Sequence, residues 1–465
     1  MISRLGEKFT DIFRKNMPDA FVFALVLTLI TSITAFFWVG ATPLKIIQSW
    51  YDGFWSMLAF GMQMVLLIIT GYSIALSPFS SRAIDKVAKY ISTPKQVYFI
   101  TVVFGMLAGL VSWGWVVIAA LLGRELALRV RGVNYAYLIA CVYFSSISWV
   151  SGLSSSIPLL LNTEKNFLIE AGILDNILPT SLTLGSTINM CMIALFVLLG
   201  PFLMLWLAPK KEKGIEIIDE LGKEEQTLNK SISQEAEDLK LPEKSFSDFM
   251  NNTSIFQYII VFMGFSYVIY HFYSKGLDLN LNIMIFFFIM IGMLLHKTPM
   301  RYSISMKRSS TNISSILYQY PFYAGIMGIM TYSGLGDALG QAIANIATID
   351  NYPFYAYVLG GIVNFAIPSG GGEFAVIGPS IIEAVNQIGA GLPDARLTEM
   401  TARASLSLAY GEALTNLLQP FFLLIVVPIM GAGLKIQARD VMGYLAIPFL
   451  IYFVLQILMV LYLPI

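Results

Sequence analysis

Four polar residues near the end of the sequence have the clearest capacity for chemistry, because they lie inside a long apolar run. They are Glu412, Thr415, Asn416 and Gln419. Residues spaced by three or four share one face of a helix, so a predicted helix gathers a carboxylate, a hydroxyl and two amides. An ionised carboxylate in the membrane interior needs a cation, a donor network or a proton. We interpret these residues as a site for a coupling ion or proton; pairing of Glu412 with backbone groups is the alternative.

A second group of polar residues surrounds a run in which a helix cannot continue. Pro368 lacks a backbone N–H group, and the three glycines after Ser369 favour neither helix nor strand. A helix that starts near Glu373 would point free N–H groups into the membrane, where they can bind a carboxylate without Arg or Lys. A kink or a close helix contact is the alternative. The predicted substrate-binding residues here are Asn364, Ser369, Gly370, Gly371, Gly372 and Glu373. Asn364 and Glu373 are also candidates for the ion or proton site.

Two further interruptions lie in the first half of the chain. Ser112-Trp113-Gly114-Trp115 interrupts one apolar run, and Ser-Gly-Leu-Ser-Ser-Ser at 151–156 interrupts the next. In hydrocarbon each unsatisfied backbone group costs several kcal/mol, so non-helical backbone persists only where protein or a water-filled cavity surrounds it. We expect these breaks to face the substrate, with Trp113 against its acyl tail; ordinary helix packing is the alternative for the serines. The predicted substrate-binding residues here are Ser112, Trp113, Gly114, Ser154 and Ser155.

The composition indicates where such residues must lie. The 465 residues are 57% hydrophobic and only 12% charged, whereas soluble chains carry about 25% charged residues. Several apolar runs approach the ~20 residues that cross a bilayer. This excludes a soluble enzyme, a nucleic-acid binder and a secreted scaffold, and the net charge of zero recruits no anionic partner. We predict an all-α polytopic membrane protein whose surroundings are the lipid bilayer.

The reactive side chains are too few for a catalytic or metal centre. His271 and His296 are the only histidines, each at the end of an apolar run, and Cys141 and Cys191 lie inside apolar runs as small core residues. The sequence contains no His-Glu-x-x-His pattern and no evident nucleophile–base pair. We therefore expect no enzyme activity, no catalytic residue and no cofactor, with sodium as the only metal to consider.

The apolar runs define the elements that must position these residues. Two runs, 98–128 and 353–388, break near the middle and are predicted to be re-entrant helical hairpins. The runs 134–161 and 400–431 are predicted to be broken helices. Nine full crossings remain when the hairpins are left out. The other predicted spans are 20–39, 54–76, 181–207, 253–272, 281–295, 311–333 and 440–464.

The positive charges orient this arrangement. With nine crossings, 24 of the 29 Lys and Arg residues fall on one side, as is typical of cytoplasmic loops. The N-terminus is then cytoplasmic and the C-terminus outside. Counting either hairpin as a simple crossing would reverse the loops that follow it and spoil this asymmetry.

The two halves of the chain follow the same order of elements. Residues 1–207 and 253–465 each contain a helix, a hairpin, a broken helix and a long final helix, and the extra crossing 253–272 inverts the second copy. Inverted repeats of this kind are typical of secondary transporters. Residues 208–252 are rich in Lys, Glu, Ser and Gln and are predicted to be a charged cytoplasmic linker, partly disordered or a surface helix. A solvated tether is the simpler interpretation of this linker, and a regulatory role is the alternative.

Several stretches point together to one family. They read MPDAFVFA at 17–24, DGFW at 52–55, AFGMQM at 59–64, LHKTPM at 295–300, PFYAGI at 321–326, NFAIPSGGG at 364–372, AYGE at 409–412 and QPF at 419–421. With Asn416, they resemble the bacterial short-chain fatty acid transporter family, the acetoacetate and butyrate uptake type. The similarity covers essentially the whole chain except the linker, and the PSGGG and HKTPM runs are its most specific parts.

The resemblance implies membership of the wider ion-transporter superfamily. Its members tend to be homodimers in which a hairpin-bearing transport domain slides, like an elevator, against a scaffold. It also implies a small monocarboxylate substrate, coupling to sodium or protons, and a place in the bacterial cytoplasmic membrane. The chain departs from the family pattern at Glu373-Phe374, where His-Trp is common, at 112–116, where Asn-Trp-Gly-Phe-Gly is common, and at Leu414, where an aromatic residue is common.

These observations lead to one hypothesis and two alternatives. The hypothesis is an alternating-access carrier that imports short-chain fatty acids, such as butyrate or acetoacetate, with sodium or protons. The alternatives are a carrier of dicarboxylates or amino-acid derivatives on the same scaffold, and a passive anion channel. A second carboxylate would need an added cationic partner, and the predicted spans contain no Lys or Arg deep inside.

Overall fold

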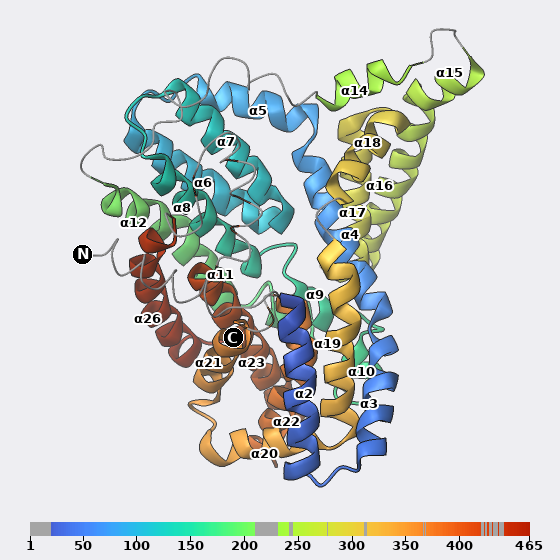
Figure 1. Ribbon diagram of the computed structural model, residues 1–465, viewed down its shortest axis with the longest axis vertical. Coiled ribbons are helices and arrows are strands. Elements are labelled where there is room, and N and C mark those ends of the chain that lie inside the picture. Colours follow the sequence, from blue (N-terminus) through green and yellow to red (C-terminus); the bar gives the residue numbers. More distant parts are fainter. Residues whose placement is uncertain are drawn as a thin grey trace.

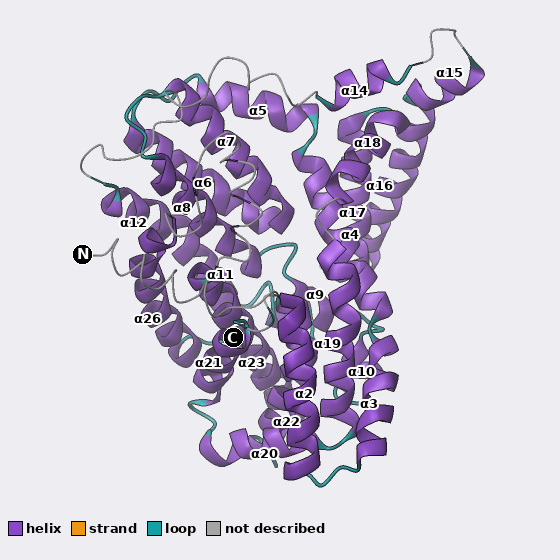
Figure 2. Cartoon of the chain, in the orientation of Figure 1, coloured by secondary structure: helices purple, strands orange, loops and turns teal. Residues whose placement is uncertain are grey.

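The computed structural model describes most of the chain, and what it describes is helix and loop (Figure 2). The described residues are 20–209, 231–240, 245–276, 278–310, 314–365, 367, 369–419, 423, 426, 430, 436 and 441–465. Within these ranges no β-strand is present. The expectation of an all-α protein is confirmed for this part of the chain.

Apolar helices dominate, because a backbone in lipid must satisfy its own hydrogen bonds. Among the described residues, 5 helices are both long and apolar enough to cross a membrane. They are Leu58–Ala75, Pro94–Val111, Tyr135–Leu161, Thr187–Leu207 and Phe246–Lys275. Shorter apolar helices span Ala24–Trp38, Leu281–His296, Tyr352–Val363 and Ala446–Tyr462. This pattern is that of a polytopic membrane protein; the count of nine crossings stays a prediction.

The first half of the chain runs from α2 to α12. Its helices are α2 (Ala20–Trp38), α3 (Pro43–Ser56), α4 (Leu58–Ala75), α5 (Pro78–Ala88), α6 (Pro94–Val111), α7 (Val116–Arg129), α8 (Tyr135–Ser145), α9 (Ser156–Leu161), α10 (Phe167–Glu170), α11 (Thr187–Ala194) and α12 (Gly200–Leu207). A π-helical turn, Leu195–Leu199, joins the last two.

The second half begins with two short helices and ends with a long one. Its helices are α14 (Ile232–Asp238), α15 (Phe246–Asn252), α16 (Ile255–Lys275), α17 (Leu281–His296), α18 (Pro299–Ser309), α19 (Ser314–Tyr332), α20 (Leu335–Ile346), α21 (Tyr352–Val363), α22 (Gly370–Ile388), α23 (Asp394–Thr415) and α26 (Ala446–Tyr462).

The helices pack into two neighbouring sets. In one set α3 packs against α19, and α4 packs against α17 and α18. In the other, α6 packs with α7, α8 and α12, and α21 packs with α23 and α26. Figure 1 shows these sets on opposite sides of the molecule. The helix α22 contacts both, because it packs against α19 and α23.

The helix breaks lie where the sequence predicts them. The chain is interrupted at 112–115 between α6 and α7, which pack against each other as a hairpin requires. It is interrupted again at 152–155 before α9, and at 364–369 between α21 and α22. Pro368 and most of the predicted broken helix beyond 419 lie outside the described residues. That the hairpins enter and leave on one membrane face stays a prediction.

One predicted span is wrong, because residues 54–76 do not form a single helix. The helix α3 ends before Met57, and α4 begins after it. At Gly53, α3 approaches α19 so closely that an added Cβ would lie 2.5 Å from the Cα of Gly328. A continuous apolar run does not reveal such a contact.

Three amphipathic helices are also absent from the sequence-based prediction: α5, α18 and α20. The first two begin with a polar cap followed by proline, at Ser77-Pro78 and Thr298-Pro299. Proline at the first helical position after such a cap is a recognised start signal, so these two could have been found. The third, α20, packs its buried face against α22 and so supports the helix that carries the triple glycine.

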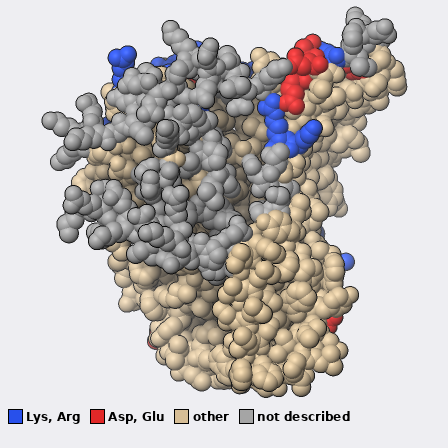
Figure 3. All heavy atoms as spheres, in the orientation of Figure 1, with Lys and Arg blue, Asp and Glu red and all other residues tan. Residues whose placement is uncertain are grey.

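Two short helices occupy part of the predicted linker. The helix α14 packs Ile232 and Ala236 against Ile304 of α18, and Glu235 pairs with Arg308 of the same helix. Residues 210–230 and 241–244 lie outside the described part. Figure 3 shows Lys, Arg, Asp and Glu side chains gathered near α14 and α18, above a broad surface that is almost free of charge. Such a surface fits the hydrocarbon layer of a membrane.

Candidate functional site

The second hairpin break is followed by the first turn of α22, which is buried in the protein interior. Ser369 is its N-cap, and its hydroxyl accepts a hydrogen bond from the Gly372 N–H at 3.4 Å. The same hydroxyl lies 3.1 Å from the hydroxyl of Tyr320 on α19. The first N–H groups of a helix have no partner within the helix. The triple glycine therefore presents backbone donors beside two hydroxyl groups, which is suitable chemistry for a carboxylate.

Other parts of the chain crowd around Gly370, the first residue of that helix. An added Cβ there would lie 3.1 Å from the ring of Trp149, 3.3 Å from Ser156 Oγ and 3.4 Å from Glu412 Oε2. Both of these oxygens are buried and have no hydrogen-bond partner among the described residues. Three separate segments therefore converge on one buried point at the start of α22.

An aromatic wall, formed by Phe60, Tyr320 and Tyr323, covers the next two glycines. An added Cβ at Gly371 would lie 2.7 Å from Phe60, and one at Gly372 would lie 3.2 Å from Tyr323. The ring of Phe60 is 6.1 Å from that of Tyr320, measured between centroids. The sequence analysis did not assign these aromatic residues to the site, although the matches at 59–64 and 321–326 contain Phe60 and Tyr323.

Five of the six residues predicted to hold an ion or proton form one buried network, and Glu373 lies outside it. The Asn364 side-chain amide nitrogen lies 2.9 Å from the Glu412 main-chain oxygen, from Thr415 Oγ1 and from Asn416 Oδ1. Asn416 Nδ2 donates to Glu412 Oε1 at 3.3 Å. Gln419 Nε2 donates to Asn416 Oδ1 at 2.8 Å and to the Asn364 main-chain oxygen at 3.3 Å. The network joins the end of α21 to the end of α23.

Several acceptor atoms in this region remain without a partner in the described structure. They include Asn364 Oδ1, Gln419 Oε1, one oxygen of Glu412 and both oxygens of Glu373. Unused oxygen atoms suit a monovalent cation or a proton. The described ranges contain no group of three or more His, Cys, Asp and Glu residues that could hold a metal ion.

The first hairpin break packs against α4. An added Cβ at Gly71 would lie 2.1 Å from Ser112 Oγ, and one at Gly114 would lie 2.7 Å from the backbone nitrogen of Tyr72. The Trp113 backbone N–H donates to Ser154 Oγ at 2.8 Å. The broken segment at 152–155 therefore holds the tip of the first hairpin directly.

The three consecutive serines have three different roles. Ser154 receives the Trp113 N–H, and Ser156 lies beside Gly370 of the second hairpin. Ser155 instead donates to the carbonyl of Val150 at 2.5 Å, within its own segment. The sequence analysis named Ser154 and Ser155, but the residue that approaches the second break is Ser156. The segment 154–156 thus connects both hairpin breaks.

A separate polar link holds the broken segment against α23. Asn189 Nδ2 donates to the carbonyl of Ser151 at 3.1 Å, and the Tyr410 hydroxyl donates to Asn189 Oδ1 at 2.9 Å. All three residues are buried. Neither Asn189 nor Tyr410 was assigned a site role from the sequence, because the two are far apart in the chain and only the fold brings them together.

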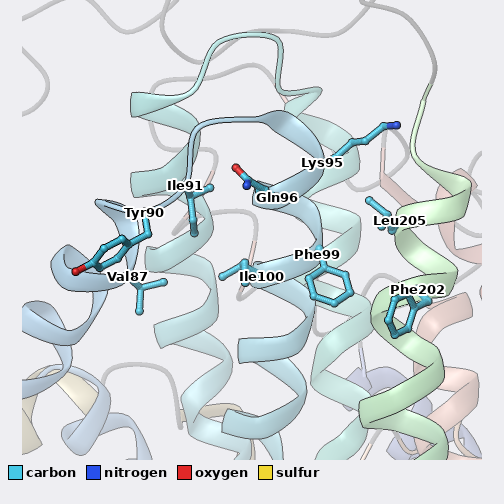
Figure 4. Close-up of a pocket in the computed structure, with 9 residues that line it drawn as sticks. All are labelled: Val87, Tyr90, Ile91, Lys95, Gln96, Phe99, Ile100, Phe202 and Leu205. Carbon is cyan, nitrogen blue, oxygen red and sulfur yellow. The ribbon is translucent and has the colours of Figure 1, made fainter.

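A groove of about 540 Å³ lies elsewhere, between α5, α6 and α12 (Figure 4). Its lining is mostly apolar and includes Ile91, Phe99, Ile100, Phe202 and Leu205. Lys95 and Gln96 are among its few polar residues. None of the residues at the helix breaks lines this groove, so it is distinct from the site at the hairpin tips.

Comparison with protein families and curated proteins gives one consistent result. Residues 1–464 match the family model described as "Short chain fatty acid transporter". A protein of Escherichia coli K12 is 34% identical over 445 residues, which cover 96% of each chain. One from Haemophilus influenzae is 33% identical over 449 residues, with the same coverage. Both relatives are named "Putative short-chain fatty acid transporter".

Two solved structures share the fold at low sequence identity. The YdaH transporter of Alcanivorax borkumensis, described as having an unusual topology, has a TM-score of 0.54 at 13% identity, covering 95% of this chain and 98% of its own. MtrF of Neisseria gonorrhoeae, from a class of antimetabolite efflux pumps, has a TM-score of 0.52 at 14% identity, covering 97% and 96%. The chain is thus an integral membrane transporter and not an enzyme, and by its full-length match it belongs to the short-chain fatty acid transporter family.

Proposed function

We propose that this protein is a secondary active transporter that imports short-chain monocarboxylates, such as butyrate or acetoacetate, across the bacterial cytoplasmic membrane. The observation that carries the proposal is the meeting of helix breaks at one buried point. Gly370, Ser156 and Glu412 come from three different breaks or helix ends and converge there. Non-helical backbone in the membrane interior is stable only where protein encloses it or a cavity is lined by it.

The substrate carboxylate docks on the first turn of α22, where backbone N–H groups and the Ser369 hydroxyl can donate to it. The short acyl tail lies against aromatic rings, with Phe60, Trp149 and Tyr320 close to the glycines and Trp113 at the first hairpin. A short chain fits this arrangement, because each glycine is already close to a ring or hydroxyl. The first hairpin contributes through Ser112, Gly114 and the Trp113–Ser154 hydrogen bond.

The coupling ion or proton binds in the network of Asn364, Glu412, Thr415, Asn416 and Gln419. Their unused oxygen atoms support this assignment, since a cation or proton would satisfy them. Glu373, which the sequence analysis also names for the ion or proton, is the further candidate for the proton. Binding of the positive charge next to the substrate site makes anion binding more favourable, which couples the two movements.

The transport cycle proposed here follows from the inverted arrangement of the two halves. Two re-entrant hairpins enter from opposite faces among nine crossings, with the N-terminus cytoplasmic and the C-terminus outside. The domain that carries the hairpins slides against a scaffold in a homodimer. The packing of α22 against both helix sets supports a site at the boundary between moving and fixed parts.

The test is uptake of labelled butyrate and acetoacetate into proteoliposomes under separate sodium and proton gradients. Protein-free liposomes measure passive entry of the undissociated acid, and this signal is subtracted. Saturable accumulation against a gradient is the expected result. No uptake of any short monocarboxylate refutes the assignment, and uptake that only equilibrates with the outside supports a passive channel instead.

A competition arm separates the proposal from a dicarboxylate or amino-acid-derivative carrier. Arg403 is the basic residue of α23 nearest to Glu412 in the sequence. It lies nine residues before Glu412, which corresponds to about 13 Å along the helix axis. It interacts with Tyr352 at that end of the helix. On α23, a second carboxylate of the substrate would therefore lack the cationic partner that it needs. We expect monocarboxylates to compete for uptake and succinate-like dicarboxylates not to compete.

A further inference from the structure

The described part of the chain contains a buried acid to which no described group donates a hydrogen bond. Glu373, in the first turn of α22, is 0% exposed, and neither of its carboxylate oxygens has a hydrogen-bond partner among the described residues. Burial of an ionised carboxylate without a partner is among the most unfavourable arrangements in a protein. The residue must therefore acquire a partner or a proton.

Among the described helices that pack against α22, no positively charged side chain lies beside Glu373. The helices packed against α22 are α9, α19, α20, α21 and α23. Their titratable groups are tyrosines on α19 and α21, Asp337 on α20, and the residues of α23; α9 has none. On α23 the group beside Glu373 is Glu412, which is also negative when ionised and acts on it electrostatically. The basic residues of α23, Arg396 and Arg403, lie toward its other end.

Glu412 and Glu373 differ in the hydrogen bonds that their carboxylates accept. Glu412 Oε1 accepts a hydrogen bond from Asn416 Nδ2 at 3.3 Å, inside the amide network. Glu373 has no comparable donor in the described structure. Hydrogen bonds to a carboxylate favour its ionised form, and a like charge nearby disfavours ionisation of the neighbour. These contacts favour the neutral form more strongly at Glu373 than at Glu412.

Glu373 also lies next to the proposed docking point of the substrate carboxylate. It follows directly after the glycines whose N–H groups are the docking point of the proposed function, on which this inference rests. An ionised Glu373 would repel an incoming carboxylate, whereas a protonated Glu373 can donate its O–H to the substrate, since neither of its oxygens has a partner among the described residues. Proton binding and anion binding at this point must then strengthen each other.

We propose that Glu373 is the residue that binds the transported proton, and that it takes up one proton together with each monocarboxylate. The proton comes from water on the side where the site is open and forms an O–H bond with a Glu373 oxygen. It returns to water on the opposite side when the substrate leaves. The substrate crosses as its carboxylate, so the carried pair is electrically neutral.

The test compares driven accumulation with exchange in proteoliposomes. A gradient of one pH unit supports about tenfold accumulation when one proton accompanies each anion. In Glu373→Gln the amide resembles the protonated acid but cannot release a proton. This variant should keep exchange of labelled for unlabelled acetoacetate, lose accumulation driven by the pH gradient, and show exchange that no longer varies with pH.

Glu383→Gln on the same helix is the matched control. Glu383 accepts a hydrogen bond from Gln387 at 2.8 Å and lies ten residues beyond Glu373, away from the glycines. This variant should accumulate acetoacetate as the wild type does. A fluorescent pH indicator inside the vesicles measures proton entry for each variant at the same time.

The outcomes separate this inference from the proposed function. Wild-type exchange without any pH-driven accumulation, or unchanged accumulation by Glu373→Gln, overturns the proton assignment and leaves the transport function standing. Loss of exchange in a folded Glu373→Gln protein overturns it too, because the amide should mimic the protonated acid. If Glu373→Gln does not fold, Glu373→Asp replaces it: retained pH-driven accumulation supports the assignment, and accumulation independent of the pH gradient overturns it. Absence of all monocarboxylate transport by the wild type removes both claims.

Discussion

Gly371→Ala tests how closely the aromatic wall covers the backbone of the site. The added Cβ would lie 2.7 Å from Phe60 Cζ, 3.1 Å from Phe60 Cε1 and 3.3 Å from the Tyr320 hydroxyl. Phe60 is itself buried and packs against Phe167, with 5.5 Å between ring centroids. The ring therefore has little freedom to move away, and either it or the start of α22 must shift.

The size of the effect follows from two opposing contributions. Overpacking of a tightly filled site costs about 1–3 kcal/mol. Replacing glycine by alanine within a helix returns about 0.5–1 kcal/mol. The difference between these ranges is about 0–2.5 kcal/mol, and we expect a net loss near its middle, about 1 kcal/mol, in the free energy of unfolding. A distortion of about 1.4 kcal/mol at the docking point would weaken substrate binding about tenfold.

The assay measures unfolding of the purified transporter and the kcat/KM for acetoacetate exchange in proteoliposomes. Gly61→Ala in α4 is the matched control, because its Cβ would lie 3.6 Å from the side chain of Tyr320, an ordinary contact. That variant should keep normal exchange and gain about 0.5–1 kcal/mol of stability from helix propensity. Adding Phe60→Leu to Gly371→Ala removes the two ring atoms that clash and should restore part of the lost stability.

Two results would refute this reasoning. One is a Gly371→Ala protein with wild-type stability and exchange, which would mean that Phe60 does not cover the glycine. The other is a double variant whose losses simply add, because a direct contact predicts a coupling of about 0.5–3 kcal/mol between the two positions.

Three other substitutions have defined expected outcomes. Asn364→Ala removes a donor that lies 2.9 Å from three acceptors. Denaturant unfolding should show that the free energy of unfolding falls by about 2–4 kcal/mol, and driven uptake should fall at least about tenfold. Unchanged uptake would contradict the role of the network. Ser154→Ala removes the hydroxyl that accepts from the Trp113 N–H at 2.8 Å, so the free energy of unfolding should fall by about 1–3 kcal/mol. Ser154→Thr should restore most of that free energy. Equal stability of all three proteins would contradict the contact. Gly53→Ala places a Cβ 2.5 Å from the Cα of Gly328, so the backbone must move. We expect the free energy of unfolding to fall by about 3 kcal/mol or more and recovery in size-exclusion chromatography to be poor. Normal recovery would exclude the close approach.

The helix breaks could be predicted from the sequence because their cause is local. Pro368 and the runs at 112–115 and 151–156, which contain Ser and Gly, interrupt apolar stretches. The triple glycine forms the first turn of α22, three residues before the predicted start near Glu373. The grouping of Glu412 with Asn416 and Gln419 likewise follows from helical spacing. The structure adds Asn364 to that group at 2.9 Å, as the sequence analysis expected from its place next to the break.

Other features could not be predicted because they depend on contacts between distant segments. Phe60 and Tyr320 are far apart in the sequence, yet both cover Gly371. Ser155 and Ser156 are equivalent in the sequence, and only the turn before α9 decides that Ser156 is the one beside Gly370. The break between α3 and α4 at Met57 is not visible in the apolar pattern of 54–76.

The central claim is that the breaks at 112–115, 154–156 and 364–373 together line one substrate-binding site. Single cysteines at Ser112, Ser156 and Ser369, in a background with Cys141 and Cys191 replaced, test it most directly through reaction with a water-soluble thiol reagent. We predict labelling at all three positions and slower labelling at all three when butyrate is present. Sealed, unreactive positions, or labelling that butyrate leaves unchanged, would contradict the claim.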